Sequence, residues 1–186
     1  MLNFTLNQTS FAQSPELASG VLADVLLHSS NLREFYPDFD VWLNNKVIPD
    51  LELGDRAILT EYRDGHLAGF AIIKDDGAEK KLCCLRIIKQ FQNSRGMGVR
   101  LFERAFEELS CEKPLLSVAE EHVLPYSRMF KYFGFEHSVR YSDIYRIGKD
   151  EYAYNGLLDS NKASVNFFDF KIHESMNLIK QSSASY

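Results

Sequence analysis

The feature that most constrains the fold is an apolar strand pattern that runs into a glycine loop and then into an amphipathic helix. Residues 81–89 (KLCCLRIIK) are apolar almost throughout, which is typical of a strand buried on both faces. A polar loop, QNSRGMG, follows, and residues 99–109 (VRLFERAFEEL) repeat their apolar side chains at helical spacing. Backbone N–H groups at the start of a helix are unpaired and, together with the helix dipole, they favour an anion. The segment therefore predicts a strand–loop–helix unit with an anion site at its loop.

Strand and helix patterns surround this unit on both sides. The turn pair Asp64-Gly65 joins two β-type runs into an expected hairpin. Because strands alternate with helices in the second half of the chain, we expect a mixed sheet covered by helices. The expected strands are 56–62, 66–74, 81–89, 115–119, 135–141 and 151–158, and the other expected helices begin at Pro15, span 38–47 between Pro37 and Pro49, and span 126–133 before Gly134.

Composition fits one folded domain and excludes several classes of protein. The chain has 186 residues, of which 45% are hydrophobic and 25% charged, so it can bury a core and is not disordered throughout. No apolar run approaches the roughly 18 residues of a membrane span. Cys83 and Cys84 are adjacent and Cys111 stands alone, which indicates neither a disulfide framework nor a metal site, and favours the reducing cytoplasm. The net charge of −5 argues against nonspecific nucleic-acid binding and suits a cationic substrate.

The strand–loop–helix unit resembles the acetyl-CoA-binding motif of the GNAT superfamily of N-acetyltransferases. The loop of that family reads Gln/Arg-x-x-Gly-x-Gly/Ala, and here the frame is NSRGMG, with Asn93 in place of Gln or Arg and both glycines present. The segment FKYFGFE also looks like the family's YEKLGFE-type segment. The resemblance covers residues 1–159. It implies an α/β (α+β) fold with a mixed, mostly antiparallel central sheet of about seven strands flanked by helices, the GNAT-like acyl-CoA N-acyltransferase fold.

Residues 160–186 lie outside the resemblance and form a C-terminal extension. We expect a helix packed on the domain with a frayed end, because Val165, Phe168, Ile172, Met176 and Ile179 share one helical stripe. The segment NFFDFKI is equally compatible with an edge strand.

The resemblance also implies acetyl-CoA as co-substrate and assigns residues to it. In the family, the strand before the loop pairs through its backbone with the pantetheine arm, and the matching positions here are Arg86, Ile87 and Ile88. Gly96 and Gly98 would allow the backbone to approach the pyrophosphate without a clashing Cβ. The full set expected around the pyrophosphate is Asn93, Ser94, Arg95, Gly96, Met97, Gly98 and Val99.

Acetyl transfer by direct attack requires the acceptor amine to lose a proton. Glu120 and Glu121 follow the strand at 115–119, where two adjacent carboxylates can raise one pKa and attract an amine. Two solvated loop acids are an equally good interpretation. We take Glu120 as the candidate base because it shares strand parity with Val118. Glu61 is a weaker candidate.

The proton donor for the leaving thiolate is the main departure from the family. A tyrosine usually lies four residues before the glycine of Gly-Phe, and here that position is Phe130, which has no hydroxyl. Tyr126 lies one helical turn earlier on the same face, whereas Tyr132 lies on another face. Tyr126 is therefore the candidate acid.

These residues predict an acetyl-CoA-dependent N-acetyltransferase that acts on a small-molecule or protein amine. The alternative is a GNAT-fold acyl-CoA-binding regulatory module with little or no turnover, which Phe130 and Asn93 favour. We expect no nucleic-acid or membrane partner and no metal, and we regard a homodimer as an open possibility. Aromatic and acidic residues in the first third of the chain can line an acceptor pocket, although core packing explains them equally well: Tyr36, Asp38, Asp40, Trp42 and Tyr62.

Overall fold

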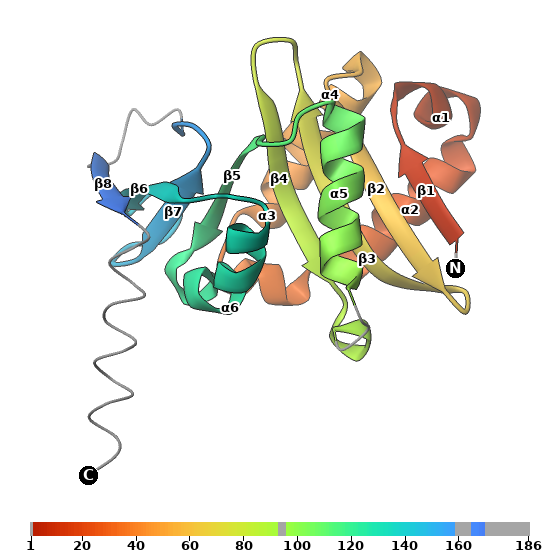
Figure 1. The fold of residues 1–186 in the computed structure, drawn as a ribbon. Helices are drawn as coiled ribbons and strands as arrows, with labels where there is room; N and C mark the ends of the chain where they lie inside the picture. Colours follow the sequence, from red (N-terminus) through yellow and green to blue (C-terminus); the bar gives the residue numbers. More distant parts are fainter. Residues whose placement is uncertain (1, 93–95, 159–164, 170–186) are drawn as a thin grey trace. The chain divides into compact units, whose positions relative to one another are not determined.

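A computed structural model describes residues 2–92, 96–158 and 165–169 (Figure 1). The chain forms two compact units, Met1–Leu115 and Leu116–Tyr186. In the described part of the chain, no helix is both long enough and apolar enough to cross a membrane.

The first unit is built on four antiparallel strands in the order β1-β2-β3-β4. Asp64 and Gly65 have positive φ angles of 51° and 79°, as a two-residue hairpin turn between β2 and β3 requires. Sequence reasoning missed the edge strand β1, although its residues LNFTL alternate apolar and polar side chains. The bounds of these strands are Leu2–Leu6 (β1), Arg56–Arg63 (β2), His66–Asp75 (β3) and Lys80–Ile87 (β4).

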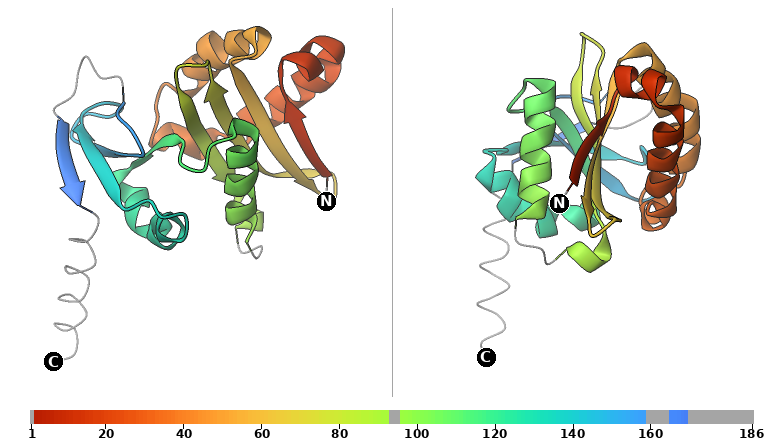
Figure 2. Two further views of the ribbon diagram at one scale, coloured as in Figure 1. Left: turned by 45° about the horizontal axis from the view of Figure 1, so that its top comes forward. Right: turned by 90° about the vertical axis from the view of Figure 1, so that its right-hand side faces the viewer.

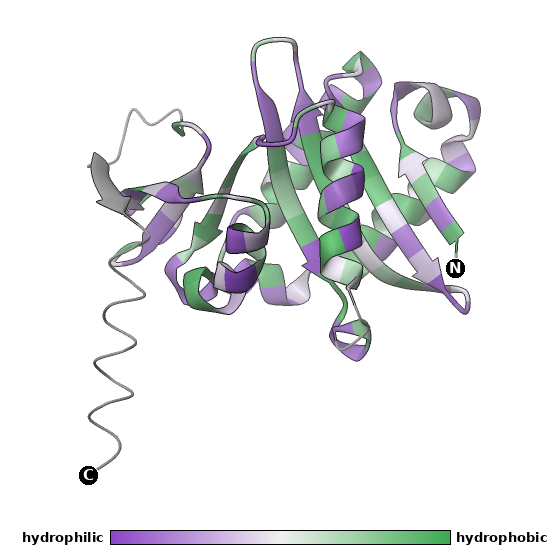
Figure 3. Ribbon diagram, in the orientation of Figure 1, coloured by the Kyte–Doolittle hydropathy of each residue, from purple (hydrophilic) through white to green (hydrophobic). Residues whose placement is uncertain are grey.

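Helices cover both faces of this four-stranded sheet (Figure 2). The expected amphipathic helix is confirmed as α5 (Met97–Leu109), which packs on β2, β3 and β4. Hydrophobic and hydrophilic residues alternate along the α5 ribbon (Figure 3). This pattern is expected of a helix with one side packed on the sheet and the other in solvent. The opposite face carries α1 (Gln8–Gln13), α2 (Pro15–Leu27), η1 (Ser30–Glu34), α3 (Phe39–Trp42), η2 (Leu43–Val47) and α4 (Ile48–Leu53).

The expected helix at 38–47 does not stop before Pro49. Instead the backbone widens into a π-helical turn at η2, where the N–H of Ile48 donates to the carbonyl of Leu43, and then continues as α4. Pro49 therefore lies inside a continuous helix, directly after the π-helical turn, which accommodates its ring and its missing N–H. A wide turn directly before a proline thus replaces the helix end that the two prolines predicted.

The core of the first unit lies between the sheet and the α2–α4 layer. Ile58, Phe70 and Ile72 of the sheet are fully buried there against Val25 and Leu43 of the helical layer. This packing fixes which side chains of β4 face the helices, a point that matters for the site below.

The second unit contains an antiparallel ladder in the order β5-β7-β6-β8, with one helix, α6, in the connection after β5. Over Val165–Asp169 the structure has a strand, β8, rather than the expected helix, and β8 pairs with the edge of β6. The run VNFFD is rich in β-branched and aromatic residues, and an open strand edge offers it hydrogen bonds. The rest of the expected C-terminal helix, 170–186, lies outside the described residues. The bounds are Leu115–Ala119 (β5), Glu120–Tyr132 (α6), His137–Ser142 (β6) and Asp150–Tyr154 (β7).

Candidate functional site

The end of β4 is held unusually close to β3 at Gly69. A Cβ added to Gly69 would lie 2.9 Å from the carbonyl oxygen of Arg86 and 2.9 Å from the Ile87 Cδ1 atom. Gly69 opposes Ile87 in the ladder, and the N–H of Ile88 donates to the carbonyl of Ala68 at 2.9 Å. The backbone expected to pair with a pantetheine arm is therefore fixed by a glycine on the neighbouring strand. The side-chain amide of Gln92 donates to the Ile87 carbonyl at 3.3 Å.

The glycine loop ends in a left-handed turn at Gly96. Gly96 has φ 72° and ψ 10° and forms the N-cap of α5, and its carbonyl accepts from the N–H of Arg100 at 3.0 Å. A Cβ at Gly98, in the first turn, would meet no atom of the described residues within 4 Å. The first turn of α5 therefore has open space beside its backbone, as an approaching phosphate needs.

Of the other residues expected around the pyrophosphate, the structure describes Met97 and Val99. Met97 is only 1% exposed, so its side chain anchors the helix in the core and only its backbone N–H is available to a ligand. Val99 is half-buried. Asn93, Ser94 and Arg95 lie outside the described residues.

An arginine that sequence reasoning did not single out lies over the Gly96 turn. The Nη1 atom of Arg100 is 3.4 Å from the position of a Cβ on Gly96. Its Nη2 atom is 3.8 Å from Oε1 of Glu61, which is 1% exposed and also pairs with Arg63 at 3.3 Å. The four-residue spacing from Gly96 to Arg100 was the signal available in the sequence. Glu61, considered above as a weaker base, instead lies between two guanidinium groups.

Glu120 and Glu121 begin α6 directly after β5, so they occupy the first turn of a helix rather than a loop. The Nζ atom of Lys149 lies 2.6 Å from Oε1 of Glu120, whose Oε2 accepts the backbone N–H of Asp150 at 3.0 Å. Arg146 and Lys149 pair with Glu121 at 2.7 and 3.2 Å.

These contacts move both pKa values downward, not upward as two adjacent carboxylates suggested. The hydrogen bond from Lys149, followed by that from the Asp150 N–H, lowers the pKa of Glu120. The hydrogen bond from Arg146 is the largest cause that lowers the pKa of Glu121, to about 2. Both side chains are therefore ionised at neutral pH, and each has an internal cation beside it.

Tyr126 lies on α6 between two rings. It stacks on His122 with ring centroids 5.3 Å apart and meets Phe130 edge-on at 6.1 Å. Helix α6 begins at Glu120, so Pro125 lies inside it, whereas the sequence placed the helix start near Pro125. Tyr132 is 68% exposed and points away from this stack, as its position on another face predicted.

Phe130 is a core residue of the second unit. It is fully buried, with its ring centroid 4.6 Å from that of Tyr154 and 6.0 Å from that of Phe135. The Tyr154 hydroxyl is buried beside it, with the Ser138 side chain as its polar neighbour. Burial is the main cause that raises the pKa of Tyr154 to about 12.

Three of the five residues considered for an acceptor pocket have internal partners in the first unit. The Tyr62 hydroxyl donates to Asp24 at 2.8 Å, and burial followed by this contact raises the pKa of Tyr62. Asp40 pairs with Arg33 at 2.8 Å. The guanidinium of Arg56 lies over the Trp42 ring, 5.4 Å from its centroid. The structure therefore supports the packing interpretation for these side chains.

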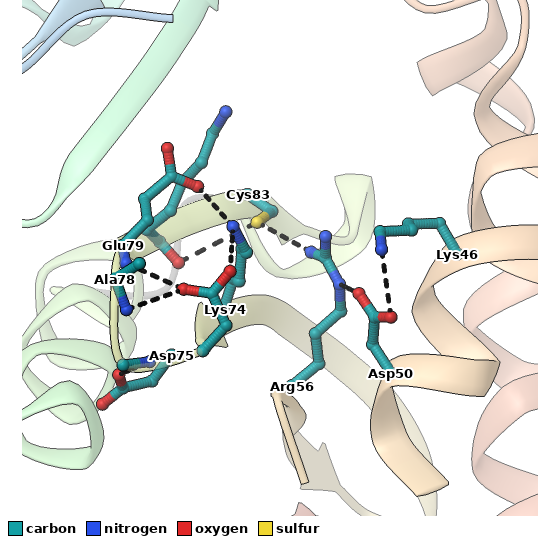
Figure 4. Close-up of polar contacts among 11 residues, drawn as sticks. Lys46, Asp50, Arg56, Lys74, Asp75, Ala78, Glu79 and Cys83 are labelled. Atoms are coloured by element: carbon teal, nitrogen blue, oxygen red, sulfur yellow. Dashed lines mark hydrogen bonds and ion pairs between the residues drawn. The ribbon is translucent and has the colours of Figure 1, made fainter. Parts of the chain in front are cut away.

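Arg56 is the centre of a buried polar cluster beneath the helical layer (Figure 4). Its Nε donates to Asp50 at 2.9 Å and its Nη1 to the Cys83 sulfur at 3.0 Å. Burial opposes ionisation of Asp50, but the hydrogen bonds from Arg56 and Lys46 leave its pKa lowered overall. Burial raises the pKa of the Cys83 thiol despite Arg56. All three cysteines are free thiols.

No protein-family model matches the chain, and no curated protein matches it. Solved structures do. An acetyltransferase of the GNAT family from Desulfovibrio desulfuricans has a TM-score of 0.59 and 17% identity, and the match covers 82% of this chain and 97% of that one. An aminoglycoside 6′-N-acetyltransferase complexed with coenzyme A has a TM-score of 0.56 at 11% identity, covering 83% and 95%.

A ribosomal-protein-alanine N-acetyltransferase from Brucella melitensis has a TM-score of 0.54 at 13% identity, covering 85% of this chain and 100% of that one. The expected class, a mixed and mostly antiparallel sheet flanked by helices, is thereby confirmed. The chain has the fold of the GNAT superfamily of acetyltransferases, as the strand–loop–helix motif predicted.

Proposed function

We propose that the chain is an acetyl-CoA-dependent N-acetyltransferase that acetylates a primary amine by direct attack. The observation that carries the proposal is the left-handed Gly96 turn at the start of the 13-residue helix α5, at the position where the fold family binds its cofactor. Acetyl transfer is also the activity named for the solved proteins that share the fold. Cytoplasmic location is part of the proposal, which the three free thiols support.

The residues present fit acetyl-CoA. Backbone N–H groups of the first turn of α5 would hold the pyrophosphate, with the open space beside Gly98 as its approach. The guanidinium of Arg100 lies over the same turn and would add a positive charge. The main chain of Arg86, Ile87 and Ile88 would pair with the pantetheine arm. When bound, acetyl-CoA supplies an activated acyl group as a thioester.

Glu120 is the proposed base. A carboxylate with a lowered pKa is too weak a base to deprotonate the free ammonium ion. It would instead accept, through a water molecule, the proton that the neutral amine gives up once it has attacked the thioester, after Lys149 releases Oε1. We expect Glu120→Gln to lower turnover by about 100-fold or more, a typical contribution of general base catalysis. If Glu120→Gln has the same turnover as the unchanged protein, Glu120 is not the base and only forms a structural ion pair.

The alternative function is a GNAT-fold module that binds acyl-CoA with little or no turnover. The complete burial of Phe130 favours it, because no hydroxyl occupies the position where the family protonates the leaving thiolate. A thiolate is itself a fair leaving group, since the pKa of a thiol is about 8.5. Catalysis without that tyrosine is therefore chemically reasonable.

Two measurements test the proposal. Acetyl-CoA should raise the melting temperature, because a ligand that binds only the native state stabilises it. Gly98→Val should abolish the shift, since its side chain fills the open space at the first turn without a positive φ. Gly20→Val in α2, where an added Cβ also meets no atom, is the matched control and should keep the shift. A normal shift in Gly98→Val would show that the pyrophosphate site lies elsewhere.

The second measurement is thiol release from acetyl-CoA across a panel of amines. An enzyme releases thiol in proportion to the amine acetylated, whereas a binding module shows the melting shift and releases none. The second outcome would establish the alternative function.

A further inference from the structure

Arg86 is an arginine at the end of β4 whose side chain faces the helical layer. In the ladder it opposes Phe70, and opposed residues of an antiparallel pair project from the same face. Phe70 belongs to the core cluster formed with Val25 and Leu43, so this face is the one covered by α2 and η2. Gly69, the next residue of β3, has its missing side chain directed at Leu101 of α5. Arg86 and the α5 helix therefore lie on opposite faces of the sheet.

Among the residues that the structure describes, none provides a counter-charge to the guanidinium of Arg86. Its Nε atom is buried and has no hydrogen-bond partner among the described residues. Arg63 and Arg140 also have an unpartnered, buried Nε, but their terminal nitrogens pair with Glu61 at 3.3 Å and with Asp150 at 3.7 Å. Across the described ranges, Arg86 has no such ion pair. Burying part of a charged group without a partner is costly unless something else pairs with it.

The neighbours of Arg86 on this face cannot serve as that partner. Cys84 lies two residues earlier on the same strand face, and burial raises the pKa of its thiol to about 12, so it is neutral. Two acids of the helical layer are already engaged: Asp24 accepts from Tyr62 at 2.8 Å, and Asp50 pairs with Arg56 at 2.9 Å.

The side chain of Arg86 lies on the opposite face of the sheet from the site proposed for the cofactor phosphates, so an anion bound by Arg86 would be a different group. The pyrophosphate would lie at the first turn of α5, on the other face of the sheet. The backbone of Arg86 belongs to the stretch proposed to pair with the pantetheine arm, so its side chain would lie beside that arm rather than beside the phosphates. A charge at this position can reach the second substrate, the amine.

We infer that the Arg86 guanidinium binds a carboxylate of the acceptor, so that the substrate is an amine that also carries a carboxylate, of the amino-acid type. The inference rests on the proposed acetyltransferase function. A guanidinium matches a carboxylate with two parallel N–H···O bonds, which fixes the orientation of the acceptor as well as its charge. It replaces the purely cationic acceptor that the net charge of −5 favoured.

The kinetic test compares the free α-amino acids with their α-amides as acceptors, and uses spermidine as a purely cationic amine. We expect thiol release with at least one amino acid and little with its amide. Arg86→Gln should raise the KM for that amino acid by about 10- to 100-fold, the usual effect of losing a charged hydrogen bond, with the KM for acetyl-CoA unchanged. Arg86→Lys should recover part of the loss, and Arg128→Gln, an exposed arginine of α6, should change nothing. Preference for amides or for spermidine would overturn the inference.

A binding measurement keeps the inference separate from the proposed function. In the presence of coenzyme A, the N-acetyl derivative of an amino acid should raise the melting temperature more than its N-acetyl amide does, and Arg86→Gln should remove the difference. If acid and amide stabilise the protein equally, or if neither does, Arg86 is only a solvated arginine and the inference is wrong, even where acetyl transfer is observed. If acetyl-CoA itself produces no shift, the proposed function fails instead.

Discussion

At the scale of single residues, the pKa values of Glu120 and Glu121 depend on partners that are distant in the sequence. Adjacent carboxylates after a buried strand suggested that one pKa would be raised. In the structure, Lys149 and Arg146, more than twenty residues downstream by number, lie against them and lower both. The two acids could be identified from the sequence. The direction of their pKa shifts could not, because the cations beside them come from the loop between β6 and β7.

Glu121 provides a pH-dependent test of these ion pairs. Its pKa is lowered from 4.5 to about 2, so the pair with Arg146 stabilises the fold fully above pH 4.5, and this stabilisation is lost as pH falls toward 2. Because the side chain is exposed, the pair is worth only about 0.2–1 kcal/mol. We expect Glu121→Gln to lower the melting temperature by about 1–3 °C at pH 7 and by nothing near pH 2. A difference that is the same at both pH values would show that the Glu121 charge does not act through this pair.

Tyr126 is the second residue-scale prediction. Its ring contacts His122 and Phe130, and its hydroxyl is the group that can donate a proton. We expect Tyr126→Phe to lower kcat about 10-fold or more with acetyl-CoA affinity little changed, because the ring contacts stay and only the proton donor is lost. Tyr132→Phe, on an exposed side chain of the same helix, is the matched control and should be silent.

Phe130→Tyr is the complementary variant. Phe130 is fully buried against Tyr154, so a new hydroxyl there must either replace the family's proton donor or lie unpaired in the core. Activity equal to or above that of the unchanged protein supports the first outcome. If Tyr126→Phe leaves turnover unchanged and Phe130→Tyr does not increase it, the thiolate leaves without a protein acid.

At the scale of elements, the sequence predicted those whose pattern is local. Helix α5 and the β2–β3 hairpin are where the amphipathic period and the Asp64-Gly65 turn placed them, within two residues. Errors arose where tertiary packing decides. A π-helical turn carries the chain past Pro49, and β8 forms because β6 offers an unpaired edge. Helix α6 begins at Glu120, although Pro125 suggested a later start.

The β3–β4 pair gives a prediction that depends on this element packing. Gly69→Ala places a methyl group 2.9 Å from the Arg86 carbonyl, a backbone atom that cannot move cheaply, so we expect a loss of about 1–3 kcal/mol in the free energy of unfolding. Gly20→Ala in the open interior of α2 should instead add about 0.5–1 kcal/mol. Urea unfolding of both variants measures the contrast. Equal stabilities would mean that β3 and β4 do not approach closely at Gly69.

At the scale of the whole molecule, the fold specifies where a cofactor would bind more clearly than how the amine is activated. The cofactor motif is contiguous, from β4 to α5, so a single sequence pattern exposed it. The groups proposed for catalysis come from α6. The acceptor contact inferred for Arg86 depends on strand parity and on helices from the first quarter of the chain. Such assembled features have no sequence pattern of their own.

The proposed activation of the amine can be tested on the intact protein through the pH dependence of its turnover. Lowered pKa values keep Glu120 and Glu121 ionised throughout the range from pH 6 to pH 10, so neither acid titrates there. The group that must lose a proton in that range is the ammonium ion of the acceptor, and kcat/KM reports groups of free enzyme and free substrate. We therefore expect kcat/KM to rise about tenfold per pH unit and to level off near the pKa of the acceptor, because only the neutral amine attacks. Two accepted amines whose pKa values differ by about one unit should give midpoints displaced by the same amount. A midpoint that stays fixed while the acceptor is changed would show that a group of the protein with a pKa in this range is the base, and would remove Glu120 from that role.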